Sequence, residues 1–451
     1  MNRASWGSRL GFILAVAGSA VGLANIWRFP YLVGYHGGAA FIILYFICLA
    51  LIGFPTFIAE ILIGRSTQTN PDSAFRQLGG KNWSWGGKLT IITGFIVASF
   101  YSAVAGWILG YFIEAALGNL HLFTEPNQVV DYHSTLMNTP WWGVLFHFIF
   151  MMGATSVLFF GVRNGIERGN KIMMPLLFVI LFLLVAQGLS MPNAKEGLTF
   201  LFYPDWSVIT PATFLIALSQ AFFTLSVGQG TLVTYGSYLK KEENLITSAF
   251  PIIIIDTLVS ILASVAVFTI VFSTGLKPDA GPDLLFHTLP WAFSQITGGY
   301  FLAFLFFLLV TIAALTSEIS ALEPLIAWLV DEKGWKRTKA VLVAGLGAFC
   351  LGIPSALSFN LLKEHTWQDQ TFFDWTHWLA SDLLIPIGGI LAVILVGWKW
   401  GADKAINHLM QGASVTFKRS PWLKIYFKFC FKYCSPFLIL LVFLSIIGLF
   451  R

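Results

Sequence analysis

Long apolar segments separated by short polar stretches run along almost the whole chain. A helix that crosses a bilayer needs about 20 apolar residues, and by this measure the pattern predicts eleven spans. Their approximate ranges are 10–33, 39–64, 86–118, 141–161, 166–190, 212–238, 247–274, 299–330, 338–358, 376–400 and 429–450. The gaps leave no room for a soluble domain, so the sequence predicts a single all-α, polytopic transmembrane domain over residues 1–451.

The first apolar segment is interrupted by residues that a simple membrane anchor does not need. Between Ala17 and Pro30 it contains two glycines, an asparagine and an arginine. A charge inside a bilayer is costly and typically marks a pathway or a site, and irregular backbone at membrane depth is tolerated beside a cavity. We therefore expect this span to break where a small polar solute binds.

The sixth span carries a matching interruption. Residues 20–25 and 226–231 both read small–Val–Gly–X–small–polar, and because they lie five spans apart they face opposite ways across the membrane. Paired Gly-interrupted spans in two halves are typical of transporters with inverted repeats and a midplane binding site. The predicted five-helix repeats cover 10–190 and 212–400, with an extra helix at 429–450.

The distribution of basic residues predicts the orientation. The chain is 57% hydrophobic and 11% charged, with a net charge of +5. If the N-terminus is cytoplasmic and the C-terminus lies on the outer face, 22 of the 27 Lys and Arg residues are cytoplasmic and 4 are outside, with Arg28 in the first span. This asymmetry agrees with the positive-inside rule. We expect a multi-pass protein of the cell (inner) membrane whose partners are lipid and a small solute, without nucleic acid; the fold allows an oligomer but does not require one.

Short motifs in a fixed order extend this picture over nearly the whole chain. They are Trp6 with 8–11, then 20–30, 37–38, Tyr45, 53–55, Glu60, 64–65, 220–226, 235–238, 315–317, 323–324 and 401–404. In this order they resemble the neurotransmitter:sodium symporter family, in its shorter prokaryotic amino-acid transporter form. The resemblance implies the LeuT-type fold, with helices 1 and 6 broken, and sodium-driven uptake of an amino acid by alternating access.

The resemblance implies two sodium sites and no organic cofactor. Sodium is a hard cation that is bound by oxygen atoms. The first site is expected to use the substrate carboxylate with Ala20, Asn25, Thr224 and Asp256; the second is expected to use Gly18, Val21, Ala313, Thr316 and Ser317. The alternative for the two hydroxyls of the second site is that they only bond back to the preceding helical turn.

The resemblance also implies a substrate site beside the first break. Amides near Gly22 and the hydroxyl of Tyr101 would bind the substrate carboxylate, and carbonyls near Ala20 and Phe223 with the Ser226 hydroxyl would bind its amino group. The side-chain pocket would consist of Val97, Tyr101, Phe223, Ser226, Gln229, Ser317 and Ala321. None of these residues offers a partner for a charged side chain, which would be costly to bury alone. We infer a bulky neutral amino acid, aromatic or large aliphatic.

Asp256 stands in the middle of an apolar span. Animal relatives resemble this stretch with an amide at this position and require chloride; their chloride ligands match Tyr45, Gln220, Thr224 and Ser260. A carboxylate at Asp256 would supply the negative charge permanently, which predicts a chloride-independent transporter. The alternative is a polar residue that caps a helix kink.

Two charge pairs resemble the gates of the family. The outer gate would pair Arg28 with Asp374, although the family usually places an acid one turn later, where this chain has His377. The inner gate would pair Arg3 with Asp331, with Tyr238 beside them. The alternative for either Asp374 or Asp331 is that it is only a solvated charge in a loop.

Other classes of protein remain as alternatives. A substrate-binding sensor or a channel on the same scaffold, or a transporter of a different small amine, would share much of this pattern. A channel requires a continuous polar lining or rings of charge along its pore. The polar residues here gather at one depth in the membrane, which argues against a channel. Neither His-Glu-x-x-His nor Gly-x-Ser-x-Gly occurs in the sequence, which argues against an enzyme.

Overall fold

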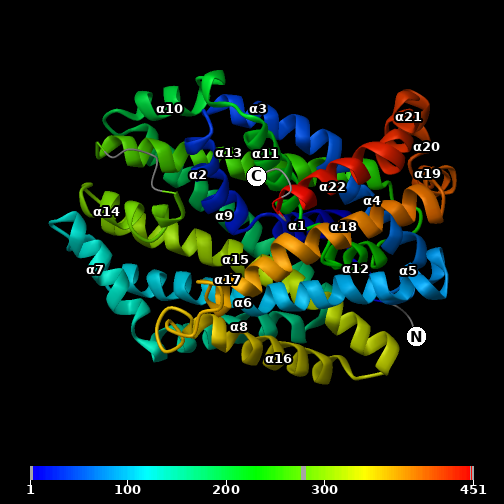
Figure 1. Cartoon of the computed structure of the whole chain (residues 1–451), viewed down its shortest axis with the longest axis horizontal. Helices are drawn as coiled ribbons and strands as arrows, with labels where there is room; N and C mark the ends of the chain where they lie inside the picture. The colour runs from blue at the N-terminus through cyan, green and yellow to red at the C-terminus, as the bar shows by residue number, and fades with distance from the viewer. Residues whose placement is uncertain (1–3, 276–280, 447, 449–451) are drawn as a thin grey trace.

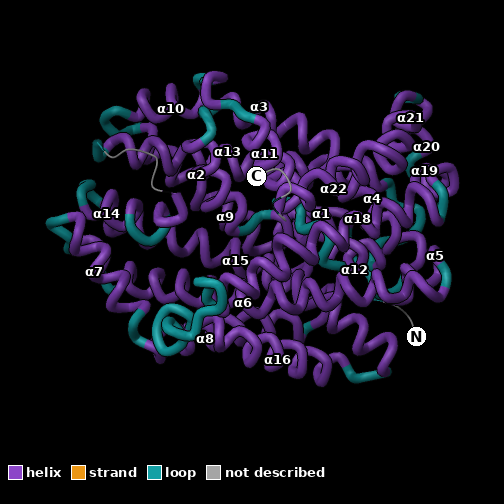
Figure 2. The backbone as a smooth tube through the Cα atoms, viewed as in Figure 1, coloured by secondary structure: helices purple, strands orange, loops and turns teal. Residues whose placement is uncertain are grey.

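Long helices lie side by side in the computed structural model of the chain, which describes residues 4–275, 281–446 and 448 (Figure 1). Figure 2 shows that short loops join the helices. Within these described ranges, the β structure is limited to two isolated bridges, Gly38 to Pro204 and Trp367 to Gln370. The prediction of an all-α protein is confirmed.

The helices of the first half fall close to the predicted spans. Their bounds are α1 (Arg9–Ala20), η1 (Ala24–Arg28), α2 (Phe29–Tyr35), α3 (Ala39–Cys48), η2 (Leu49–Gly53), α4 (Phe54–Thr67), α6 (Ser84–Ala116), α8 (Pro140–Phe159), η5 (Val162–Glu167) and α9 (Arg168–Leu189). The segments η1, η2 and η5 are π-helical turns that continue into the next helix.

The helices of the second half follow the same plan. Their bounds are α11 (Pro211–Phe223), α12 (Thr231–Ser237), α13 (Leu245–Ser273), α15 (Gly299–Lys333), α16 (Arg337–Leu357), α17 (Phe372–His377), η8 (Trp378–Leu384), α18 (Ile385–Ile394), η9 (Leu395–Lys399), α21 (Trp422–Phe429), η10 (Cys430–Cys434) and α22 (Ser435–Ile446). The connections contain α5 (Pro71–Gly79), η3 (Lys81–Trp83), η4 (Asn119–His121), α7 (Pro126–Met137), α10 (Ala194–Phe202), η6 (Trp206–Val208), η7 (Gly281–Leu284), α14 (Thr288–Ser294), α19 (Ala402–Met410) and α20 (Ser414–Arg419).

Length and composition identify the membrane spans among the described residues. Nine helices there are long and apolar enough to cross a bilayer. A tenth span is the pair Arg9–Ala20 and Ala24–Tyr35, which is bent by 56° at its break. The predicted sixth span is divided into α11 and α12, neither of which is long enough alone. Both predicted interruptions are therefore real breaks in the backbone.

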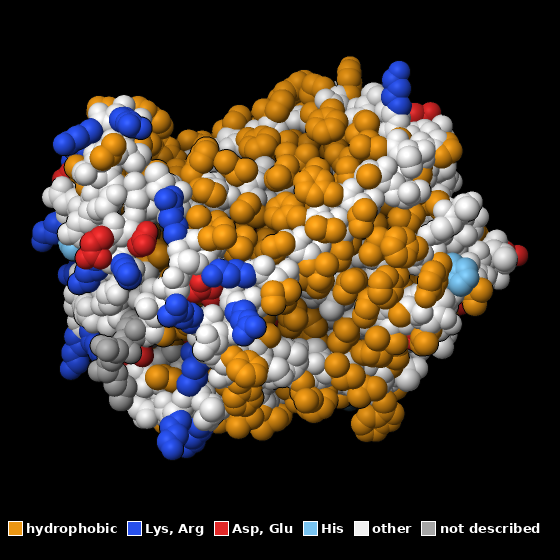
Figure 3. All heavy atoms as spheres, turned by 180° about the vertical axis from the view of Figure 1, so that it is seen from behind, with side chains coloured by type: hydrophobic (Ala, Val, Ile, Leu, Met, Phe, Trp, Pro, Cys, Tyr) orange, Lys and Arg blue, Asp and Glu red, His pale blue; other side chains and the backbone are white. Residues whose placement is uncertain are grey.

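The two ends of the bundle differ in charge. The helices α7, α10 and α14 lie at one end, and α5, α19, α20 and α21 lie at the other (Figure 1). In Figure 3 lysines and arginines gather at the end that carries α19 to α21, beside a broad apolar surface. This separation is the one expected when the positively charged end faces the cytoplasm.

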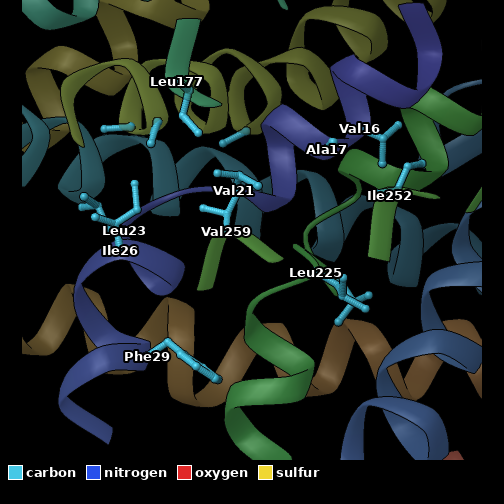
Figure 4. Close-up of a cluster of buried hydrophobic side chains, with 14 of the residues drawn as sticks. Val16, Ala17, Val21, Leu23, Ile26, Phe29, Leu177, Leu225, Ile252 and Val259 are labelled. Atoms are coloured by element: carbon cyan, nitrogen blue, oxygen red, sulfur yellow. The ribbon is translucent and has the colours of Figure 1, made fainter. Parts of the chain in front are cut away.

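Apolar side chains pack closely around the first break. Figure 4 shows Val21 and Leu23 on either side of the stretch where the ribbon of α1 stops being helical. Val16, Val21 and Ile26 are at most 1% exposed. These apolar side chains hold the break in place on the sides where the helices pack against it.

Candidate functional site

The first break exposes backbone carbonyls that no helix bond uses. Val21 adopts an extended conformation with ψ of 107°. The amide of Gly22 donates to Asn25 Oδ1 (3.0 Å) instead of continuing the helix. A side chain at Gly22 would stand 2.7 Å from Ser317 Oγ and 3.2 Å from Tyr101 Oη, so only glycine lets α1 approach these two residues.

The second break is held in a different way. Ser226, Gly228 and Gly230 all have positive φ, of 55°, 85° and 76°, which lets the chain turn between α11 and α12. The amide of Gly228 donates to the buried Glu60 Oε1 (2.7 Å), and Ser226 Oγ donates to the carbonyl of Ser19 (2.9 Å). These two hydrogen bonds fix the second break against α4 and against the first break.

The hydroxyl of Ser317 lies at the centre of a group of carbonyl oxygens. Its Oγ is 3.5 Å from Gly18 O, 3.3 Å from Ser19 O, 3.3 Å from Val21 O and 3.2 Å from Ala313 O. One hydroxyl proton satisfies one of these acceptors, so the group is rich in lone pairs. Oxygens about 3.4 Å apart also match neighbouring ligands around a cation that binds oxygen at roughly 2.4 Å. The residues present therefore fit a sodium ion.

Thr316 completes the predicted second sodium site. Its hydroxyl donates to Ala313 O (2.9 Å), as the alternative interpretation expected, yet its own lone pairs stay available to a cation. The structure thus brings together all five predicted residues of this site, and it adds the carbonyl of Ser19, which the sequence did not indicate.

The predicted first sodium site is built around Asp256, which is fully buried. Asn25 Nδ2 donates to Asp256 Oδ1 (2.7 Å) and lies 3.1 Å from Thr224 Oγ1 and 2.8 Å from Ser260 Oγ. Thr224 Oγ1 lies 3.0 and 3.1 Å from the two carboxylate oxygens. To act as an oxygen ligand of sodium, the Asn25 amide must turn so that Oδ1 takes the place of Nδ2.

Of the residues that resemble chloride ligands, Tyr45 and Thr224 contact the Asp256 carboxylate and Ser260 contacts its backbone. The hydroxyl of Tyr45 lies 3.5 Å from Asp256 Oδ2, and Ser260 Oγ donates to the backbone carbonyl of Asp256 (3.1 Å). Gln220 lies further along and donates to Ala24 O (3.1 Å). The hydroxyls of Tyr45 and Thr224, two of the residues that resemble chloride ligands, therefore lie against the Asp256 carboxylate.

A cavity of about 650 Å³ opens beside both breaks. It is lined by every residue predicted for the substrate, namely Ala20, Gly22, Val97, Tyr101, Phe223, Ser226, Gln229, Ser317 and Ala321. The hydroxyl of Tyr101 is buried near Ser317 and the backbone of Leu23, but no group within the described part of the chain meets it with good hydrogen-bond geometry. A ligand in the cavity would give this donor a partner.

Charged residues also line this cavity. The guanidinium of Arg28 lies over the ring of Phe223, 5.2 Å from its centre. Asp374 faces the cavity, but its Oδ2 accepts from the amide (2.9 Å) and the hydroxyl (2.7 Å) of Thr371 and so caps its own helix. Among the residues that the structure describes, no carboxylate lies within 4.0 Å of Arg28.

Asp382 lines the cavity with His377 and was not among the site residues predicted from the sequence. Asp382 interacts electrostatically with both His377 and Arg28. A carboxylate in the middle of the tenth apolar span was the available signal, because such charges are rarely tolerated without a role. Its interaction with Arg28 makes Asp382 a further candidate for the partner of that residue.

The inner gate is described in part. Arg3 lies outside the described residues, and Asn70 Nδ2 donates to Asp331 Oδ2 (3.2 Å). The hydroxyl of Tyr238 donates to Glu323 Oε1 (2.7 Å). Arg337 donates from Nη1 to the same oxygen (2.9 Å) and from Nη2 to Glu323 Oε2 (2.7 Å). Tyr238 thus belongs to a buried charge network that connects α12, α15 and α16.

Comparison with known proteins identifies the family. The model of the sodium:neurotransmitter symporter family matches residues 3–135 and 128–451. An uncharacterized sodium-dependent transporter of Bacillus subtilis is 36% identical over 98% of both chains. The chain belongs to the sodium:neurotransmitter symporter family. A similar relative, also named as an uncharacterized sodium-dependent transporter, occurs in Haemophilus influenzae, with 36% identity over 98% of both chains.

A solved structure of the same fold matches along the whole chain. The crystal structure of MhsT in complex with L-phenylalanine has a TM-score of 0.88 and 40% identity, covering 99% of this chain and 100% of that one. The predicted LeuT-type fold and the prediction of a sodium-dependent membrane transporter, and not an enzyme, are confirmed.

Proposed function

We propose that this symporter imports a bulky neutral amino acid, aromatic or large aliphatic, together with two sodium ions and without chloride. The observation that carries this proposal is the convergence of the Ser317 carbonyl group, the Asp256 cluster and the 650 Å³ cavity at the two helix breaks. Two oxygen-rich positions next to one cavity are what coupled binding of ions and solute requires.

The lining of the cavity supports the proposed substrate class. Beside the breaks, the walls are the apolar side chains of Val97, Phe223 and Ala321, with Gln229 as a neutral polar group. The charged residues that line the cavity are Arg28, Asp374 and Asp382. A charged substrate side chain placed against Val97 and Ala321 would be costly to desolvate, so a neutral side chain fits these walls better. The bound phenylalanine of MhsT belongs to the same class of solute.

Coupling follows from where the charges lie. The substrate carboxylate would meet the amide of Gly22, which now donates to Asn25 Oδ1 and is released when the Asn25 side chain turns, and sodium at the first site would neutralise the carboxylate. Sodium at the second site would fix the first break against Ser317 on α15. Alternating access then means that the outer residues around Arg28 and the inner network around Tyr238 open in turn, because each biases an equilibrium between two conformers.

The test is a thermal-shift screen of the purified protein with the twenty amino acids, each in sodium and in potassium chloride. Ligand binding stabilises the folded state by RT ln(1 + [L]/Kd). We expect stabilisation by large neutral amino acids in sodium only. Stabilisation that is indifferent to sodium, or stabilisation by charged amino acids, would contradict the proposal. In proteoliposomes, collapse of the sodium gradient should abolish accumulation, whereas a sensor would keep its binding.

A further inference from the structure

Asn170 is a buried amide with half of its hydrogen-bonding capacity unused. It lies on α9 and is 0% exposed. Its Nδ2 donates to the carbonyl of Ile166 in the π-helical turn η5 (2.9 Å). This bond fixes the amide, so Oδ1 points away from its own helix. Oδ1 has no hydrogen-bond partner within residues 4–275, 281–446 and 448.

An unsatisfied buried acceptor needs an explanation. Leaving such a group without a partner costs about 1–3 kcal/mol, and the great majority of buried polar groups in proteins are paired. An apolar residue of similar size would avoid this cost at the Asn170 position. The oxygen is therefore expected to bind something that the protein atoms alone do not supply.

The direction of Oδ1 identifies the place where this partner would lie. A Cβ added to Gly18 would overlap with Asn170 Oδ1 and would stand 3.2 Å from Thr316 Cβ. Asn170, Gly18 and Thr316 therefore meet at one point between α9, α1 and α15. Gly18 and Thr316 are two of the residues in the proposed second sodium site.

Gly18 and Thr316 belong to a group of acceptors with few protons to share. The carbonyls of Gly18, Val21 and Ala313 lie 3.2–3.5 Å from the hydroxyl of Ser317. Asn170 adds an oxygen with free lone pairs next to Gly18 and Thr316, while its Nδ2 donates to Ile166. A further acceptor next to such a group needs a cation or a water molecule to bind it, and in a group so rich in lone pairs a cation satisfies several oxygens at once.

We propose that Asn170 Oδ1 is an additional oxygen ligand of the second sodium site. This inference rests on the proposed sodium coupling and adds a residue from α9 to a site otherwise built from α1 and α15. A ligand from a third helix would make sodium binding hold α9 against α1 at Gly18. The position of α9 would then depend on whether the second site contains its ion.

The experiment measures sodium affinity directly. Purified protein in saturating substrate is titrated with sodium chloride, with choline chloride keeping the ionic strength constant, and the unfolding midpoint is followed. Asn170→Leu removes the oxygen at similar volume and should raise the half-saturating sodium concentration about tenfold, as loss of supporting groups at metal sites does. Asn170→Asp keeps an oxygen and adds a negative charge. Its half-saturating sodium concentration should therefore be equal to or lower than that of the unmodified protein.

A matched control tests for mere packing effects. Thr269 is also fully buried, and its Oγ1 would overlap with a Cβ on Gly188, but its hydroxyl is satisfied by Val265 O (2.7 Å). Thr269→Val should leave the sodium titration unchanged. In choline chloride alone, Asn170→Leu should change the unfolding midpoint little, because removal of the unpaired acceptor offsets the loss of the Nδ2 hydrogen bond to Ile166 O (2.9 Å).

The outcomes separate the two proposals. An unmodified protein that shows no sodium response would refute sodium coupling itself. If the unmodified protein responds to sodium and Asn170→Leu has the same half-saturating sodium concentration, then Asn170 is not a ligand. The proposed function would remain intact. If Asn170→Leu does not fold, Asn170→Ala makes the same deletion of the oxygen and is read in the same way.

Discussion

Asp256→Asn should turn a chloride-independent transporter into one that responds to chloride. The substitution keeps the size of the side chain but removes the one negative charge that Asn25, Thr224 and Tyr45 approach at 2.7–3.5 Å. The hydroxyl protons of Thr224 and Tyr45, which point at the carboxylate, then become available to an added anion. Chloride in their place would restore part of the lost charge.

The size of the effect follows from the geometry of the cluster. An ion held between Asn25, Thr224 and Asp256 lies within about 4 Å of the carboxylate, and at an effective dielectric constant of 20 a pair of unit charges at that distance interacts with about 4 kcal/mol. Every 1.4 kcal/mol corresponds to a factor of ten, so sodium affinity should fall by up to roughly a thousandfold. This is an upper value, because the amide oxygen of the new residue can still bind the ion.

The assay is a sodium titration of the unfolding midpoint in saturating substrate, performed in chloride and again in gluconate. The unmodified protein should give one curve in both salts. Asp256→Asn should require much more sodium in gluconate and recover in part in chloride. The control is Asp374→Asn, which also removes a carboxylate that lines the cavity, though one that caps its own helix at Thr371; it should show no chloride effect.

Either of two results would refute the reasoning. If Asp256→Asn binds sodium as tightly as the unmodified protein, then the carboxylate does not contribute to the first site. If the unmodified protein itself needs chloride, then Asp256 does not replace the anion, although the fold and the sodium sites would be unaffected.

Three further predictions concern other parts of the molecule. Tyr101→Phe should weaken substrate binding by roughly 10- to 100-fold, the value of a hydrogen bond to a charged group, while leaving the midpoint without substrate unchanged, because this hydroxyl has no protein partner in the described residues. Gly228→Ala should lower the unfolding midpoint, since φ is +85° and the new Cβ would overlap with the carbonyl of Ile385; the left-handed conformation alone costs about 1–2 kcal/mol. Burial, and then the neighbouring His287, lower the pKa of His133 in α7 to about 4. The unfolded chain therefore binds this proton more readily, so stability should decrease as the pH falls from 6.5 to 4; His133→Gln should show a smaller decrease in a pH series of unfolding midpoints.

The spans and their two breaks could be predicted from local patterns, whereas the LeuT-type fold was expected from the resemblance to a family. The lengths of the apolar segments predicted the membrane spans, because a helix that crosses a bilayer needs a minimum length. The glycines near Gly22 and Gly228 indicated both breaks, because an interrupted apolar span makes sense only beside a cavity. The residues predicted for the substrate all line one cavity, since the ordered motifs of the family carry positions as well as residue types.

The order of residues is enough to identify the kind of molecule: a helical membrane protein with two broken spans, basic residues concentrated at one end, and an acid at Asp256. These features depend on composition and spacing along one segment at a time. Which groups share a partner became visible in the folded chain. It assigned Asp374 to the cap at Thr371, placed Asp382 near Arg28, and directed the unpaired oxygen of Asn170 at Gly18. The physical reason is that a hydrogen bond or an ion pair depends on distances of a few ångströms between helices far apart in the chain, and no pattern within one helix specifies those distances.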